Sequence, residues 1–145
     1  MLLQAGADTP ECLERVNALL AHPEFSLKNP NKSRALIGAF SANLRRFHAA
    51  DGAGYCWLAD RIVQVSDDRE INAAFFESSC DPGFRNAQVD KINPQNAARL
   101  AAAFSTFRRY DEGRQGLIRD QLQRLLSTPG LSKDTFEIAT RSIKG

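Results

Sequence analysis

The sequence predicts an all-α protein, and two observations carry that prediction. Apolar residues recur at intervals of three or four along most of the chain, which is the spacing of one helix face. Several of these stretches open at helix-start signals, above all the two Asn-Pro pairs at residues 29–30 and 93–94. No stretch alternates between apolar and polar residues as a half-buried strand would. The 145 residues suit one domain with a substantial core, so we expect residues 1–145 to form a single helical domain.

Two helices are expected in the N-terminal third. The first covers residues 9–22, with Thr9 as its N-cap, Pro10 in the first helical position, and an end near His22 because a proline follows. The second opens at the Asn-Pro pair of residues 29–30. Their predicted buried faces consist of Leu13, Val16, Leu19 and Leu20 in the first helix, and Leu36, Ile37 and Phe40 in the second.

Two further helices are expected over residues 51–65 and 93–110. A turn containing two glycines opens the former, and Asn93 caps the latter ahead of Pro94. Apolar positions at helical spacing predict the faces that they bury. These positions are Tyr55, Leu58, Ala59 and Ile62 in one helix, and Leu100, Ala101, Phe104 and Phe107 in the other.

The C-terminal third predicts two last helices, over residues 111–128 and 132–144. The first carries Asp111 and Glu112 in its first turn, where the helix dipole favours negative charge, and Ser132 caps the second. The residues expected to point inward are Ile118, Leu122 and Leu125, followed by Phe136, Ala139 and Ile143.

The predicted helices form pairs joined by short turns that contain proline or glycine, which is how α-solenoids are built. We therefore expect a curved stack of antiparallel helical hairpins, a HEAT/armadillo-like α-solenoid. No strict sequence period is detectable, so a compact bundle is the alternative. Residues 66–88 interrupt the pattern, and we expect them to hold a short helix at about 67–78 and a Pro-Gly loop.

The chain carries no recognisable catalytic set or metal site. Its two histidines, His22 and His48, are far apart in sequence, and the H-E-x-x-H pattern of zinc peptidases is absent. Each histidine is expected at a helix end, with its ring bonded to backbone. Asp111 and Glu112 suit the helix dipole better than an acid/base pair. We predict no catalytic residue, no metal ligand and no cofactor in this segment.

Composition narrows the setting of the protein. No apolar run approaches the roughly 20 residues that cross a bilayer, and the first ten residues lack a basic leader, so a cytoplasmic location without membrane contact is expected. The net charge of +2 comes from interspersed signs without a basic stripe, which speaks against nucleic acid as a partner. Three cysteines at irregular spacing are expected to be free buried thiols, with a disulfide improbable.

Several motifs resemble one known family in collinear order over nearly the whole chain. They are HPEFSLKNPNKSRALIGAF, FHAADGAGY, NPQNAARL, RRYDEGRQ and the closing LSKDTFEIATRSIKG. Together they resemble the C-terminal helical domain of bacterial-type aminopeptidase N, a zinc metallo-aminopeptidase of the gluzincin class. The resemblance implies that zinc and the catalytic residues belong to an upstream domain, since neither H-E-x-x-H nor G-x-M-E-N occurs here.

The resemblance also implies a role for this segment as a non-catalytic domain. It would pack on the upstream catalytic domain, enclose the active-site chamber, and admit peptide substrates while excluding folded proteins. Arg34 and Arg99 align with arginines that the family directs toward the chamber, and residues 66–88 look like an insertion. Alanines around Arg99 leave room for its guanidinium. The alternative is a free-standing helical-repeat adaptor that binds a peptide or protein partner.

Overall fold

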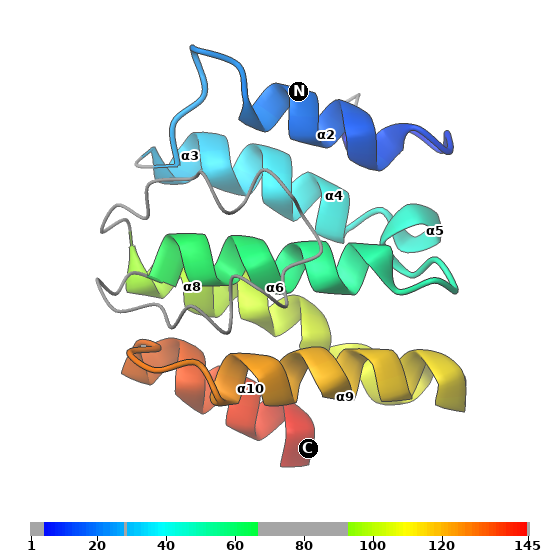
Figure 1. Ribbon diagram of the computed structural model, residues 1–145, viewed down its shortest axis with the longest axis vertical. Coiled ribbons are helices and arrows are strands. Elements are labelled where there is room, and N and C mark those ends of the chain that lie inside the picture. Colours follow the sequence, from blue (N-terminus) through cyan, green and yellow to red (C-terminus); the bar gives the residue numbers. More distant parts are fainter. Residues whose placement is uncertain (1–4, 28, 67–92, 145) are drawn as a thin grey trace.

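The fold is all-α, as the sequence predicts. The computed structural model describes residues 5–27, 29–66 and 93–144, and all regular structure in these ranges is helical (Figure 1). No helix in this part of the chain is long and apolar enough to cross a membrane. The helical elements are α2 (Cys12–Leu20), α3 (Pro30–Ser33), η1 (Arg34–Gly38), α4 (Ala39–Ser41), α5 (Leu44–Phe47), α6 (Ala53–Ser66), α8 (Pro94–Ala101), η3 (Ala102–Arg109), α9 (Glu112–Leu126) and α10 (Lys133–Lys144).

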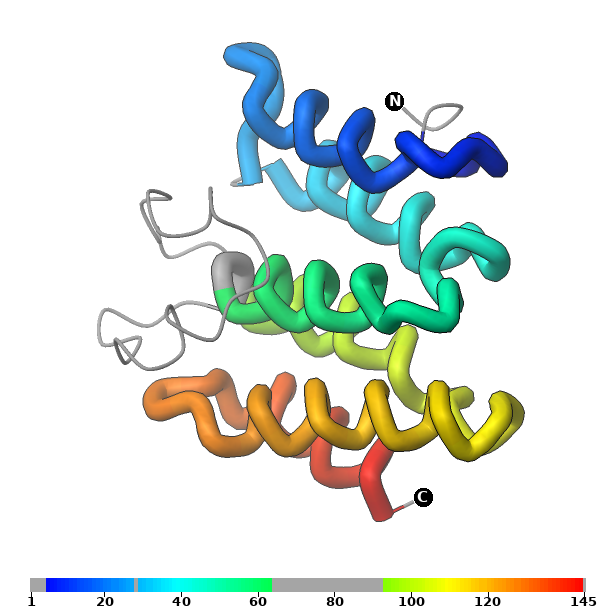
Figure 2. The backbone as a smooth tube through the Cα atoms, turned by 45° about the vertical axis from the view of Figure 1, so that its right-hand side comes forward, coloured from blue at the N-terminus to red at the C-terminus, as the bar shows by residue number. Residues whose placement is uncertain are grey.

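Three antiparallel hairpins are stacked in two layers (Figure 2). The first hairpin pairs α2 with the rod from α3 to α4, the second pairs α6 with the rod from α8 to η3, and the third pairs α9 with α10. The first layer contains α2, α6 and α9, and the second contains the rod from α3 to α4, the rod from α8 to η3, and α10. Contacts run between hairpin partners, as from α6 to α8, and between neighbouring hairpins, as from α8 to α10. The predicted hairpin stack is therefore confirmed. The short helix expected at 67–78 and most of the 66–88 segment lie outside the described residues.

Four of the predicted helix starts are confirmed by side-chain caps. Asn29 accepts hydrogen bonds from the N–H groups of Asn31 and Lys32. Three other helices open in the same way, because an oxygen of the cap residue accepts from a backbone N–H of the first turn. These caps are Asn93 for α8, Asp111 for α9 and Ser132 for α10.

The predicted cap at Thr9 is wrong. Helix α2 begins at Cys12, two residues later than predicted, and Glu11 in the N-cap position makes no side-chain hydrogen bond. The carbonyl of Thr9, rather than its hydroxyl, accepts from the N–H of Cys12 at 3.0 Å. Residues 9–11 thus form a turn ahead of the helix, and the residues before them are held by contacts to the connection between α4 and α5.

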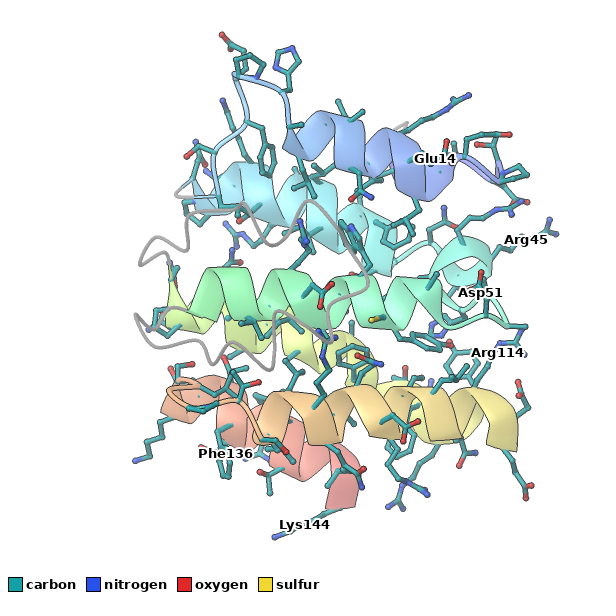
Figure 3. The ribbon with its side chains drawn as sticks, in the orientation of Figure 1. Glu14, Arg45, Asp51, Arg114, Phe136 and Lys144 are labelled. Carbon is teal, nitrogen blue, oxygen red and sulfur yellow. The ribbon has the colours of Figure 1, made fainter. Side chains whose placement is uncertain are left out.

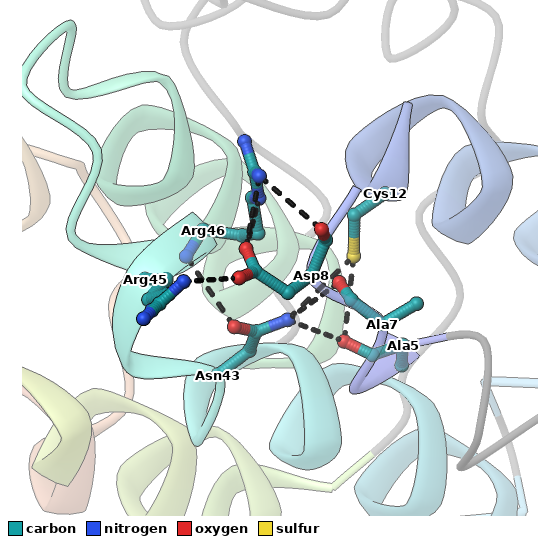
Figure 4. A network of polar contacts seen from close by, with 7 residues as sticks. All are labelled: Ala5, Ala7, Asp8, Cys12, Asn43, Arg45 and Arg46. Atoms are coloured by element: carbon teal, nitrogen blue, oxygen red, sulfur yellow. Dashed lines mark hydrogen bonds and ion pairs between the residues drawn. The ribbon is translucent and has the colours of Figure 1, made fainter. Parts of the chain in front are cut away.

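Asn43 makes those contacts (Figure 4). Its amide Nδ2 donates to the carbonyls of Ala5 at 3.2 Å and Ala7 at 3.1 Å, and its Oδ1 accepts from the N–H of Arg46. Nearby, the Asp8 carboxylate pairs with Arg45 at 2.6 Å and Arg46 at 2.9 Å. The Asn43 side chain therefore caps α5 and holds the N-terminal segment beside this helix.

Two predicted helices depart from α geometry. In the rod that spans Pro30–Ser41, the middle segment η1 is π-helical, while the flanking pieces are α-helical. In the rod that spans Pro94–Arg109, the second half, η3, is a 3₁₀-helix. A π-segment inside an α-helix and a long 3₁₀ run are both uncommon, and both occur often at functional sites or strained positions.

Helix α6 lies at the centre of the core. Its nine residues from Tyr55 to Val63 are all buried, so the helix is enclosed on every side rather than along one stripe. Aromatic rings join it to the first hairpin: Phe40 packs edge-on to Trp57 at 5.0 Å, and Phe47 packs edge-on to Tyr55 at 5.3 Å. The predicted inward residues of this helix and of the second, fourth and fifth helices are all buried.

One predicted buried face is rotated. On α10, Ala139 is buried as expected and Ile143 packs against the core, but Phe136 is 48% exposed. The buried face runs instead through Thr135, Ala139 and Ser142. These small side chains let α10 pack closely on its neighbours α8, α9 and η3, where a phenylalanine would need more room. The hydrophobicity of Phe136 therefore misled the prediction.

A buried ion pair connects the first-layer helices α6 and α9. The carboxylate of Asp60, which is fully buried, accepts from Arg124 at 2.7 Å, and the Arg124 side chain is 14% exposed. Cys56 lies one turn earlier on α6 and is disulfide-bonded. The expectation of buried thiols is therefore wrong for Cys56, whereas Cys12 is a buried thiol outside any disulfide, as expected.

Two glycines make the turn into α6 tight enough for this packing. Gly52 has a φ of +70°, which residues with a Cβ rarely adopt. At Gly54, a Cβ would lie 2.5 Å from the backbone oxygen of Phe47, a contact that real Cβ atoms do not make. The close approach of α5 to α6 thus requires glycine at position 54.

We expect Gly54→Ala to lower the free energy of unfolding by roughly 2 kcal/mol or more, since backbone must move to admit the methyl group. Urea unfolding of the two proteins measures the change. Gly116→Ala is the matched control, because Gly116 lies inside α9 and a Cβ there meets no atom within 4 Å. The control should gain about 0.5–1 kcal/mol from helix propensity. Equal stability of the two variants would contradict the packing argument.

Candidate substrate-facing surface

The first predicted site residue, Arg34, is the first residue of the π-helical segment η1, in the rod from α3 to α4. Its Nε donates to the carbonyl of Pro30 at 3.2 Å, and its Nη2 donates to Oδ1 of Asn31 at 2.7 Å. The side chain is exposed, and these two bonds hold the guanidinium against its own helix. Arg34 therefore has donors left for a ligand, since a guanidinium carries five N–H groups.

The second predicted site residue, Arg99, is exposed on α8 and makes no hydrogen bond or ion pair with any other residue that the structure describes. It lies between two shallow grooves. A groove of about 300 Å³ on one side is lined by Gly38, Ser41, Ala42, Arg99, Leu100 and Ala103. A groove of about 450 Å³ on the other side is lined by Gln95, Ala98, Arg99, Asp134, Glu137 and Ile138.

The smaller groove lies between the rod that carries Arg34 and the helix that carries Arg99, and both arginines are exposed. Gly38 lies about one turn after Arg34 on the same rod, and it lines the smaller groove together with Arg99. We call this region the second-layer surface, defined by Arg34, Gly38, Ser41, Ala42, Ala98, Arg99 and Ala103. Helices from all three hairpins border it, because α10 supplies the far wall of the larger groove.

The two grooves differ in charge. The smaller groove contains no acidic side chain among its lining residues, whereas the larger one contains Asp134 and Glu137. Glu137 also pairs with Arg141 at 2.7 Å. An anionic ligand group would therefore approach Arg99 from the smaller groove, and a cationic group would suit the larger one.

The expected room around Arg99 is only partly explained by its alanine neighbours. Ala97 and Ala101 are buried in the core, whereas Ala98 lines the larger groove. Sequence reasoning missed Gly38, whose missing side chain opens the smaller groove: a Cβ at that position would meet nothing within 4 Å. It also missed Asp134, because helix α10 is distant in sequence. Only Gly38 carried a sequence signal, as a glycine inside a predicted helix.

The structure does not bring the two histidines together. Nδ1 of His22 accepts from the N–H of Glu24 at 3.1 Å, so the expected bond between ring and backbone is confirmed there. His48 ends α5, and its ring partner is a side chain: Nδ1 lies 2.8 Å from the hydroxyl of Tyr55. Within the described ranges, no three His, Cys, Asp or Glu side chains gather where they could hold a metal ion.

His48 belongs to a buried polar cluster at the turn between α5 and α6. Its ring stacks on Tyr110 at 4.0 Å, and its carbonyl accepts from Nε of Arg114 at 2.7 Å. Burial lowers the pKa of His48 below its ordinary value of 6.5, and the nearby Arg114 adds to this effect. Burial also raises the pKa of Tyr55 to about 12. Both rings are therefore neutral at pH 7, and the cluster joins the first, second and third hairpins.

Asp111 has the structural role that its position indicates. Its Oδ2 accepts from the N–H of Arg114 at 3.0 Å, and its Oδ1 pairs with the guanidinium of the same residue at 2.6 Å. These bonds to Arg114 lower the pKa of the Asp111 carboxyl. The Asp111 carboxylate therefore caps α9 and positions Arg114 over the carbonyl of His48. These bonds support a structural role for Asp111 rather than an acid/base pair with Glu112.

Comparisons with known proteins agree with the stacked hairpins. A family model described as a domain of unknown function (DUF3458_C) with ARM repeats matches residues 1–74 and 86–144. The chain is 37% identical over 142 residues to aminopeptidase N of Caulobacter vibrioides and 33% identical over 143 residues to that of Escherichia coli. The two matches include 97% and 98% of this chain, respectively, but the chain spans only 14% of the length of each relative.

A solved structure shows the same likeness. The crystal structure of Legionella pneumophila aminopeptidase A in complex with aspartic acid matches 98% of this chain with a TM-score of 0.73 and 32% identity, and the match covers 14% of that protein. The two-layer stack thus defines a helical-repeat domain of the ARM type. The chain belongs to the DUF3458_C family, and its resemblance to the C-terminal helical domain of aminopeptidase N is confirmed.

The lowered pKa of His48 predicts a pH dependence of stability. The unfolded chain takes up a proton at this histidine as the pH falls through 6.5, whereas the folded chain does so only at lower pH. The contribution of His48 is therefore complete above pH 6.5 and is lost as the pH falls below that value. We expect His48→Gln to flatten this part of the curve, measured by urea unfolding between pH 8 and the onset of acid unfolding.

His22→Gln is the control for this experiment, since the ring of His22 is exposed. The carboxylates of Asp8 and Asp111 have lowered pKa values, and their contributions are lost only below 3.8, in a separate range. A wild-type curve that is flat just below pH 6.5, or a His48→Gln curve of unchanged slope, would contradict the assigned role.

Proposed function

We propose that this chain is the non-catalytic C-terminal domain of a zinc aminopeptidase that removes N-terminal residues from peptides. One observation carries the proposal: nearly the whole chain matches a region that makes up only 14% of each aminopeptidase N relative. Such a protein has most of its length elsewhere, and the catalytic residues would lie there. The parent would act in the cytoplasm.

The zinc ion of such an enzyme would be bound outside this segment. The described residues offer no cluster of three ligands, and both histidines are engaged singly at helix ends. Zinc would supply an activated water for hydrolysis in the upstream domain. The contribution of this chain would be a wall of stacked hairpins that encloses the chamber, admits peptides and excludes folded proteins.

Within that wall, the second-layer surface is the face that we assign to the chamber. Arg99 has no partner in the described ranges, and a guanidinium in that state can hold a carboxylate or a peptide carbonyl through paired hydrogen bonds. The groove beside Gly38, which has no acidic residue in its lining, gives such a group access from one side. Arg34 borders the same surface but is partly engaged by its own helix, so its contribution would be smaller.

The first test concerns the arginines in the complete enzyme. We expect Arg99→Ala to raise KM for peptides roughly tenfold, because a charge-assisted hydrogen bond contributes about 1.5–3 kcal/mol, and Arg34→Ala to raise it less. The melting temperature should change little. Arg119→Ala is the matched control, since Arg119 is an exposed arginine on α9 in the other layer. Unaltered kinetics for both Arg34→Ala and Arg99→Ala would remove these residues from the chamber.

The second test asks whether zinc binding and hydrolysis belong to the upstream part of the polypeptide. The full-length polypeptide should contain stoichiometric zinc and hydrolyse an aminoacyl-arylamide, with activity lost on chelation and restored by zinc. It should cleave a short peptide but leave the same N-terminal sequence uncut when that sequence begins, without a linker, at a folded domain. The 145-residue chain alone should show neither zinc nor turnover. Turnover by this chain alone would overturn the proposal.

The adaptor alternative makes a different prediction about the gene. The reading frame before residue 1 should encode a peptidase domain with an H-E-x-x-H motif if our proposal is correct. A natural start without such a domain would favour a free-standing helical-repeat adaptor, and the grooves beside Arg99 would then bind a partner's peptide.

A further inference from the structure

Among the described residues, only two large hydrophobic side chains are exposed: Leu44 at 68% and Phe136 at 48%. Leu44 stands alone at the start of α5. Phe136 lies on α10, the last helix of the stack, and Figure 3 shows it together with Lys144 at that end of the molecule. An isolated exposed leucine is ordinary, whereas an apolar side chain within a groove indicates an interaction surface.

Phe136 is part of a continuous groove along one face of α10. The groove has a volume of about 580 Å³ and is lined by Lys133, Phe136, Glu137, Thr140, Arg141 and Lys144. We call this face the outer α10 face. The opposite face of the helix packs on α8, α9 and η3. No other described helix contributes a residue to this groove, so its apolar centre is left exposed within the part of the chain that the structure describes.

The rim of the groove is cationic. Lys133, Arg141 and Lys144 surround it with only one carboxylate, Glu137, which is already paired with Arg141 at 2.7 Å. Two copies of the chain joined by two-fold symmetry would place these cations against one another, which electrostatics disfavours. The surface that complements this face is therefore apolar at its centre and acidic at its edge.

We propose that the outer α10 face docks onto an acidic, apolar-centred surface in the remaining part of the same polypeptide. This inference rests on the proposed function, which supplies a long upstream region. The relatives carry most of their length outside the matched part, and a tethered surface binds at a high effective concentration without an extensive interface. Contacts at the outer α10 face would fix the position of the helical stack against that upstream region.

The experiment uses the full-length protein with the photo-crosslinking amino acid p-benzoyl-phenylalanine at position 136, and at position 44 as the matched control. Irradiation at low protein concentration, followed by peptide mapping, identifies what lies against each position. We expect position 136 to form an intramolecular crosslink to an upstream peptide rich in Asp and Glu, and position 44 to form at least fivefold less. Lys133→Glu combined with Lys144→Glu should lower the yield at position 136 severalfold, whereas Arg119→Glu should not.

A crosslink between two copies, or no upstream crosslink at position 136, would overturn the proposal. A crosslink that is unaffected by the charge reversals would overturn the acidic character of the partner surface. Activity is measured on the same samples, which separates the two proposals. Zinc-dependent hydrolysis with no crosslink would contradict the docking alone, whereas absence of an upstream peptidase domain would contradict the proposed function.

Discussion

The burial of α6 on all sides is the constraint on which the rest of the structure depends. A helix enclosed in this way must find a partner for every polar group, and Asp60 does so through its ion pair with Arg124 on α9. The turn that leads into it must bring backbone against backbone, which Gly54 permits opposite Phe47. The other helices are arranged around it: the first hairpin covers it with aromatic rings, and α8 and α9 cover it from the other sides.

This arrangement produces the second-layer surface. Because the buried faces of the second-layer helices point toward α6 and its neighbours, the opposite faces are left side by side on one exposed surface. Residues from different hairpins thereby come to share a groove, as Gly38 and Arg99 do. The π-helical segment at Arg34–Gly38 contributes to this surface, since a widened turn changes the direction of the side chains that it carries. A cationic group in a shallow groove is suited to positioning an extended ligand, as the proposed function requires.

The candidate site was accessible from the sequence only in part. Arg34 and Arg99 came from a resemblance and lie on one exposed surface. Nothing in their sequence neighbourhoods indicated that Arg34 folds back on Asn31, whereas Arg99 makes no such bond to the residues that the structure describes. Asp134 reaches the groove beside Arg99 from a helix that starts more than 30 residues later in the chain, and no local pattern reports such a neighbour. The tether formed by Asn43 was missed for the same reason, because its partners precede it by more than 30 residues.

The sequence alone determined the helical class, the starts of four helices, and the inward faces of most of them. These features depend on local physics: a cap bonds to its own first turn, and apolar spacing selects the face that leaves water. Tertiary structure decided the rest, because packing compares faces from different helices. On α10 it buried the small residues Thr135, Ala139 and Ser142 and left Phe136 outside, although hydrophobicity favoured the opposite choice. Close approach between helices is limited by side-chain volume on both surfaces, and one helix by itself carries no information about the other.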